Sequence, residues 1–264
     1  MGVPKIDPLV AATVLILINI VYVLFASLQF SYLFGAWQGQ LPAGQSYAEY
    51  ARSGFFELIA VSAINFAILA GTLTFGGEAG KGMRRLNDTL LYILVGCSAI
   101  MLVSAFTRLL LYEEAYGYTY IRFLSHAFML YLAVLLVCAG LRIRYVALPL
   151  AKCFIVISIS AYVTVNYTNM DRIIAAKNIE RYRETGHIDV DYLAGLSPDA
   201  VPELLKFSRQ AGPGLDPEPR TQLNRRLHER WDGLTQGEHG WQSSNLAESR
   251  AARKLRADRI HATE

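Results

Sequence analysis

The stretch FTRLLLYEEAYGYTYIRFLSHAFMLY, residues 106–131, joins the end of one strongly apolar segment to the start of the next through a short acidic and aromatic turn. Two apolar segments joined in this way are typical of consecutive membrane-spanning helices. The stretch also carries ionisable side chains within or beside the membrane, where a charge is costly and usually has a reason to be present. These side chains are Arg108, Glu113, Glu114, Arg122 and His126.

The composition of the whole chain also favours a membrane protein. Of its 264 residues, 53% are hydrophobic and 18% are charged, which indicates a membrane domain or a very large core. Residues 1–166 carry ten basic and seven acidic side chains, whereas residues 167–264 carry fifteen of each. The apolar part therefore accounts for the net charge of +3, and the neutral tail argues against a nucleic-acid partner.

Five apolar segments are long enough to cross a bilayer, which takes about 20 helical residues. The first has no charged residue and no convincing cleavage site, so we interpret it as a retained helix and not as a signal peptide. We therefore predict an all-α fold, a polytopic membrane bundle of five transmembrane helices with a small helical C-terminal tail. The predicted spans are residues 8–34, 55–75, 88–112, 122–141 and 145–166.

The loops between these spans predict the orientation of the bundle. Only Arg52 lies in a short loop on one side, with Arg108 and Arg122 just inside the neighbouring helices. By the positive-inside rule, the amino terminus is expected in the cytoplasm and the tail from residue 167 outside it. Together with the family resemblance described below, this orientation leads us to expect the chain in a bacterial cytoplasmic (inner) membrane. The basic residues predicted to be cytoplasmic are Lys5, Lys81, Arg84, Arg85, Arg142, Arg144 and Lys152.

The tail divides into two helical parts. Residues 167–210 form a predicted helical extension, in which TGHIDVDYLAGL, residues 185–196, is interpreted as a turn and Ser197-Pro198-Asp199 as a helix start. Residues 211–219, AGPGLDPEP, are interpreted as a linker because they are rich in glycine and proline. Residues 220–264 are then a basic helical tail, expected to be partly disordered.

The predicted orientation places most polar residues of the bundle at its outer end, so a site is expected to face outward. The candidates for catalysis are Glu57, Glu113 and His126, as acid or base. The binding candidates, suited to an anionic head group or a polar ligand, are Arg52, Arg108, Arg122, Asn166 and Asp171.

Each candidate also has a structural interpretation. Arg108 and Arg122 lie near helix ends, where long basic side chains extend to the membrane interface. Glu113 and Glu114 suit solvated loop charges that could pair with an arginine, and His126 and Glu57 suit hydrogen bonds between helices. No spacing indicates a metal site or a cofactor, and all the cysteines, Cys97, Cys138 and Cys153, lie in apolar runs.

Three long blocks carry a family resemblance. They are SYAEYARSGFFELIAVSAINFAIL (46–69), RLLLYEEAYGYTYIRFLSHAFMLYLA (108–133) and NMDRIIAAKNIERYRETGHIDVDYLAGLSPDAVPELL (169–205). Together they resemble an uncharacterised bacterial membrane-protein family, the domain-of-unknown-function 4173 group, which is related to the 4153 group. The resemblance covers most of residues 20–207. It implies the membrane architecture and brings no established activity. Members usually carry further helices upstream, so the chain would be a shortened member or a carboxy-terminal portion.

Three functions remain open from the sequence. The first is a structural or signalling component of the bacterial envelope, whose tail and outer loops contact a protein partner or a second copy of the chain. The second is an envelope enzyme that acts on a lipid-linked or cell-wall substrate at the outer leaflet. The third is a transporter component, against which stands the lack of an internal repeat. All three share the lipid bilayer as a partner.

Overall fold

The computed structural model describes residues 5–37, 46–77, 79–209, 217–235 and 246–263. Regular structure in these residues is helical, apart from a single isolated bridge between Ile6 and Gly76. This confirms the predicted all-α fold. The chain forms two compact units. Unit 1 holds helices α1–α5 without the turn between α3 and α4, and unit 2 holds that turn, Tyr116–Phe123, and the residues from Thr168 onward.

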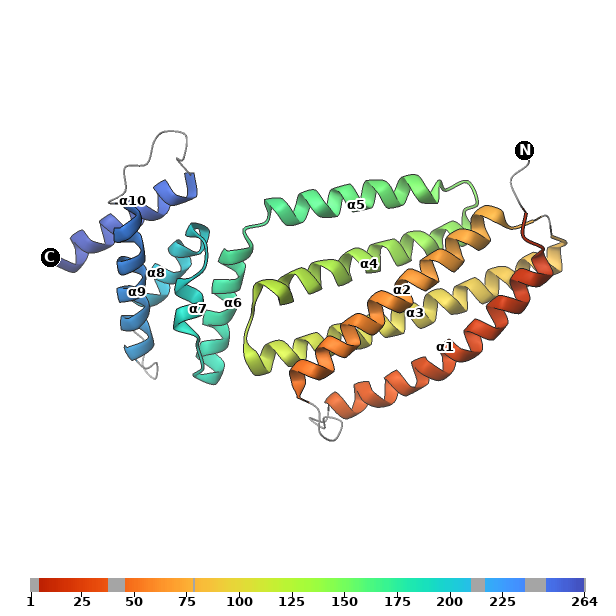
Figure 1. The fold of residues 1–264 in the computed structure, drawn as a ribbon, viewed down its shortest axis with the longest axis horizontal. Helices are drawn as coiled ribbons and strands as arrows, with labels where there is room; N and C mark the ends of the chain where they lie inside the picture. Colours follow the sequence, from red (N-terminus) through yellow and green to blue (C-terminus); the bar gives the residue numbers. More distant parts are fainter. Residues whose placement is uncertain (1–4, 38–45, 78, 210–216, 236–245, 264) are drawn as a thin grey trace. The chain divides into compact units, whose positions relative to one another are not determined.

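Unit 1 is a bundle of long apolar helices. Successive helices run in alternating directions, as expected for a chain that crosses a membrane repeatedly (Figure 1). Within the described residues, five helices are long and apolar enough to cross a bilayer, which confirms the predicted count. The chain is accordingly a membrane protein. The helices are α1 Pro8–Trp37, α2 Tyr47–Phe75, α3 Lys81–Tyr116, α4 Tyr120–Arg144 and α5 Leu150–Tyr167.

Buried side chains join the first four helices in two clusters. One cluster brings together Leu15 of α1, Leu69 of α2, Leu94 of α3 and Ala139 of α4. Leucines that face outward from the bundle are exposed; for example, 69% of the Leu130 surface is exposed. An apolar outer surface is what lipid contact requires. The second cluster consists of Leu58, Met101, Ala105, Leu109, Met129 and Leu132.

Polar bonds between helices add to this packing. The Asn19 side-chain amide donates to the Leu90 carbonyl at 2.9 Å, which ties α1 to α3. The Asn65 amide donates to the Ser98 hydroxyl at 2.6 Å and ties α2 to α3. In an apolar medium an unpaired amide is costly, so such bonds help to fix which helix faces act as contacts.

Unit 2 is a small helical domain. Residues 185–196, predicted as a turn, contain the short helix α7, because Asp189 caps it by accepting a hydrogen bond from the Tyr192 amide at 2.9 Å. Of the predicted linker 211–219, residues 211–216 lie outside the described residues and 217–219 form the start of α9. The elements are α6 Met170–Thr185, α7 Val190–Ala194, the 3-10 turn η1 Pro198–Ala200, α8 Val201–Arg209, α9 Pro217–Thr235 and α10 Leu246–Thr263.

Unit 2 has a hydrophobic core of its own. Ile174, Leu193 and Phe207 are almost fully buried, and α9 contributes Leu223 and Leu227. Burying a leucine or phenylalanine in this way stabilises a fold by about 1.5–3 kcal/mol. The basic segment 220–264 therefore supplies core residues, and its last helix adds Ala251 and Leu255.

The turn that joins α3 to α4 belongs to this unit. Its Tyr118 amide donates to Asn178 Oδ1 at 3.0 Å, and Asn178 Nδ2 donates back to the Tyr118 carbonyl at 2.8 Å. The Tyr192 hydroxyl accepts a hydrogen bond from the Tyr120 amide at 3.1 Å, and burial raises the pKa of that hydroxyl. Gly117 adopts φ +82°, a conformation that glycine tolerates best.

Candidate functional site

The candidate residues of the bundle begin on α2, whose start is fixed by a capping box. The Ser46 hydroxyl accepts from the Glu49 amide at 3.2 Å, and the Glu49 carboxylate accepts from the Ser46 amide at 3.1 Å. Helical spacing then places Tyr50, Gly54 and Glu57 along one face. This face is where α2 meets the arginine of α3.

Arg108 is buried between α2 and α3, with 6% of its surface exposed. Its guanidinium lies 3.7 Å from the Glu57 carboxylate and 4.5 Å from the centre of the Tyr50 ring. A negative charge and an aromatic face both stabilise a guanidinium that water does not reach. Gly54 makes room for it, since a Cβ at that position would come within 2.8 Å of the Arg108 side chain.

A second pair joins α3 to α4. Glu113 Oε1 lies 2.8 Å from His126 Nε2, and both side chains are largely buried. The His126 ring also packs edge-on against Phe106, with ring centres 4.9 Å apart. The expectation that Glu113 is a solvated loop charge is wrong, because α3 continues to Tyr116 and turns this carboxylate inward.

We call these four side chains, Glu57, Arg108, Glu113 and His126, the paired end of the bundle. The space beside Glu57 and Arg108 amounts to about 10 Å³, close to that of a single water molecule. An acid and a base are therefore present. Glu57 is 44% exposed, whereas Arg108, Glu113 and His126 are largely buried, so a substrate would have to displace side chains to reach these three. The arrangement holds three helices together as it stands.

The other candidates lie apart from the paired end. Arg52 is exposed and donates to the Ala48 carbonyl of its own helix at 3.2 Å. Asn166 is also exposed and donates to Tyr162 of its own helix at 2.7 Å. Two candidates make contacts within unit 2: Arg122 donates to the Gly117 carbonyl of the turn, and Asp171 accepts from the Ser197 amide at 3.3 Å.

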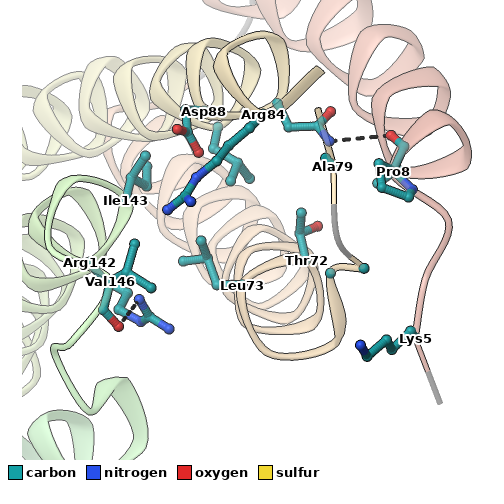
Figure 2. Close-up of a pocket in the computed structure, with 15 residues that line it drawn as sticks. Lys5, Pro8, Thr72, Leu73, Ala79, Arg84, Asp88, Arg142, Ile143 and Val146 are labelled. Atoms are coloured by element: carbon teal, nitrogen blue, oxygen red, sulfur yellow. Dashed lines mark hydrogen bonds between the residues drawn. The ribbon is translucent and has the colours of Figure 1, made fainter. Parts of the chain in front are cut away.

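The opposite end of the bundle holds a cavity of about 480 Å³ (Figure 2). Its lining includes three basic side chains, Lys5, Arg84 and Arg142, and we call this the basic end. The sequence does not predict this cavity, because the positive-inside rule alone accounts for basic residues at these helix ends. A sequence feature that could have indicated the cavity is that Lys5, Arg84 and Arg142 lie near the ends of three predicted helices on the same side of the membrane.

Among the described residues, no group of three or more His, Cys, Asp and Glu side chains could hold a metal ion. The Cys97, Cys138 and Cys153 thiols are free.

A family model described as Domain of unknown function (DUF4153) matches residues 2–207. The chain belongs to this family. The resemblance noted in the sequence named the 4173 group, to which DUF4153 is related, and the description agrees that the family is uncharacterised. No curated protein and no solved structure matches the chain. The match to DUF4153 spans the bundle and helices α6–α8, whereas α9 and α10 lie beyond it.

Proposed function

We propose that this DUF4153 protein is a structural or signalling component of the bacterial cell envelope, in which the bundle holds unit 2 at the membrane for a protein partner. The observation that carries the proposal is how the side chains of the paired end contact one another. Each acidic group contacts a basic group, three of the four side chains are largely buried, and the space beside Glu57 and Arg108 is that of about one water molecule, which suits a structural role.

Unit 2 supports the same proposal. It has its own core, and it presents charged side chains on its surface, such as Lys206 and Glu184. A compact helical domain can contact another protein without any catalytic group, and surface charges contribute specificity to such a contact. The partner is an envelope protein or a second copy of the chain.

We further propose that the protein lies in the cytoplasmic (inner) membrane with its basic end inward and unit 2 outward. What supports this orientation is the gathering of Lys5, Arg84 and Arg142 around one end of the bundle. Basic residues near helix ends are retained on the cytoplasmic side.

Photo-crosslinking in intact cells tests the proposal. A photoreactive amino acid at Glu184 or Lys206, both exposed on unit 2, is expected to give a discrete adduct with one protein. The same amino acid at Leu130, which faces outward from α4, serves as the lipid-facing control and is expected to give no such adduct.

Two isosteric variants separate this proposal from an envelope enzyme. Glu57→Gln and His126→Gln are expected to retain the adduct and any growth phenotype that complementation restores, with changes mainly in protein abundance. Normal abundance combined with loss of complementation, and no adduct from unit 2, would instead establish these side chains as catalytic.

A further inference from the structure

One wall of the cavity at the basic end is formed by the residues that lead into the first predicted membrane span. Residues 5–8, which we call the N-terminal strap, run beside the turn between α2 and α3. The Ile6 amide donates to the Phe75 carbonyl at 2.7 Å, and the Gly77 amide donates to the Ile6 carbonyl at 2.9 Å. The Asn87 side-chain amide also donates to the Pro8 carbonyl at 3.2 Å. The cavity therefore has a built wall on this side.

Gly77 permits the close approach of the strap. A Cβ at this position would lie 2.9 Å from the Ile6 carbonyl oxygen, which is a backbone atom that cannot turn away. The strap and the turn consequently form a fixed edge, and α1, α2, α3 and α4 complete the cavity.

The charges around the cavity are unbalanced. Lys5, Arg84 and Arg142 line it, and Asp88 is the one acidic side chain among the described lining residues. Figure 2 shows the Arg84 side chain extending from α3 into the cavity, with the Arg142 guanidinium on the α4 side. Arg142 also donates to the Val146 carbonyl, which holds its guanidinium in place. The excess positive charge suits an anion.

Apolar side chains in the lining narrow the choice of anion. Ala11, Leu73, Leu91 and Ile143 line the cavity together with the basic residues. A ligand with a phosphate next to an apolar part matches both surfaces, because guanidinium groups bind phosphate oxygens with paired donors. Phospholipid phosphates lie at the depth of transmembrane helix ends, where basic pockets between helices bind anionic head groups.

Only some of the basic residues at this end of the bundle line the cavity. Arg85 follows Arg84 on α3, and Arg144 lies two positions beyond Arg142 on α4, yet neither of them lines the cavity. The positive-inside rule needs only charge on the correct side of the membrane and does not distinguish these positions.

We propose that this cavity binds a phosphate group carried by an anionic membrane phospholipid, with Arg84 and Arg142 as the main phosphate donors and Lys5 closing the site from the strap. The apolar walls then accept the part of the lipid next to its phosphate. This site is independent of the partner role proposed for unit 2.

Native mass spectrometry of the full chain, released from bilayers of phosphatidylcholine with a minor fraction of phosphatidylglycerol, tests the proposal. Retained phosphatidylglycerol is expected to fall roughly tenfold or more in the double variant Arg84→Gln/Arg142→Gln, because each loses a charge-assisted bond to phosphate. The matched control Arg85→Gln/Arg144→Gln removes the same charge outside the cavity and is expected to retain the lipid.

Loss of positive charge could itself disturb membrane insertion. The charge-conserving variant Arg84→Lys/Arg142→Lys controls for this effect. It keeps the basic end positive but lacks the planar donors, so an intermediate loss of phosphatidylglycerol is expected. Equal losses in the cavity variant and in its matched control would overturn the proposal, since general electrostatics would then explain the binding.

The source of the phosphate is tested by adding excess inorganic phosphate to the same samples. Unchanged retention of phosphatidylglycerol supports a lipid ligand. If inorganic phosphate binds to the wild-type chain and not to the cavity variant, while phosphatidylglycerol shows no preference over phosphatidylcholine, the lipid assignment is overturned in favour of a soluble phosphate compound.

Discussion

At the paired end of the bundle the charged side chains contact one another, whereas at the basic end they surround a cavity. Arg108 is matched by Glu57 and by the Tyr50 ring, and His126 is matched by Glu113. Among the described residues that line the basic end, positive side chains outnumber negative ones. The difference indicates that charge near a membrane helix end serves assembly where it is balanced and ligand binding where it is not.

The largest expected effect concerns the side of the membrane that each end faces. In a background without Cys97, Cys138 and Cys153, a cysteine at Glu114 is expected to react with an impermeant reagent in intact cells, and a cysteine at Lys81 is not. The reason is that retained basic residues mark the cytoplasmic side. Reaction at position 81 only would reverse the orientation of both ends.

The next prediction concerns removal of the Glu113–His126 contact at the paired end. Glu113→Ala is expected to destabilise the bundle by about 3 kcal/mol, because removing one partner of a buried pair leaves the other uncompensated. Unfolding in mixed micelles measures the loss. The adjacent Glu114→Ala, at an exposed position, is the matched control with an expected change under about 0.5 kcal/mol. Equal effects of the two changes would show that the pair contributes little.

Glycine replacements on α2 examine how closely the paired end is packed. Gly54→Ala is expected to cost about 1–3 kcal/mol, since the new Cβ would displace the Arg108 side chain. Gly71→Ala lies on the same helix with open space around it and is expected to be neutral or slightly stabilising. The same unfolding measurement compares them, and a neutral Gly54→Ala would contradict the close packing.

A smaller effect is expected at the turn that joins α3 to α4. Asn178→Ala removes both bonds to Tyr118 and is expected to cost about 1–2 kcal/mol. Faster hydrogen exchange in residues 116–123 would report the loss locally. Asn166→Ala is the control, because its exposed amide bonds only to its own helix and its loss should leave that exchange unchanged.

The smallest effect on stability is expected from the exposed ion pair of Lys177 and Glu180, which serves as a reference for the buried pairs. The hydrogen bond and the charge of Lys177 lower the pKa of Glu180 on α6. A lowered pKa stabilises the fold above the pKa of the unfolded chain, and this contribution disappears as the pH falls through the folded value. Lys177→Gln should therefore alter thermal stability only slightly at neutral pH and not at all in acid. A large change at neutral pH would contradict the view that exposed pairs contribute little.

Much of the fold could be predicted from the sequence. Continuous apolar runs determine the five long helices, because hydrocarbon leaves the backbone few alternatives. The short helix α7 was missed because its signal, a capping aspartate at position 189, is brief and lies within a polar segment. The beginning of α9 at Pro217 was missed because proline suggested a linker, although proline also suits a first helical turn.

The two ends differed in how far they could be predicted. The interpretation of Glu57 as a side chain that bonds between helices agrees with its position 3.7 Å from the Arg108 guanidinium of α3. The partner of His126 was not foreseen, since it depends on α3 extending far enough to turn Glu113 inward. The basic cavity could not be foreseen, because it depends on how the ends of four helices and the strap meet in space.

The hydrogen bonds of the strap also have a consequence for how the protein is made. A ribosome produces Ile6 long before Phe75 and Gly77, to which it bonds, so the strap cannot form these two bonds until the end of α2 has been synthesised. The cavity is completed only after α4 has been synthesised. A chain interrupted between α3 and α4 already has the strap and its partners but lacks the α4 side of the cavity, including Arg142 and Ile143.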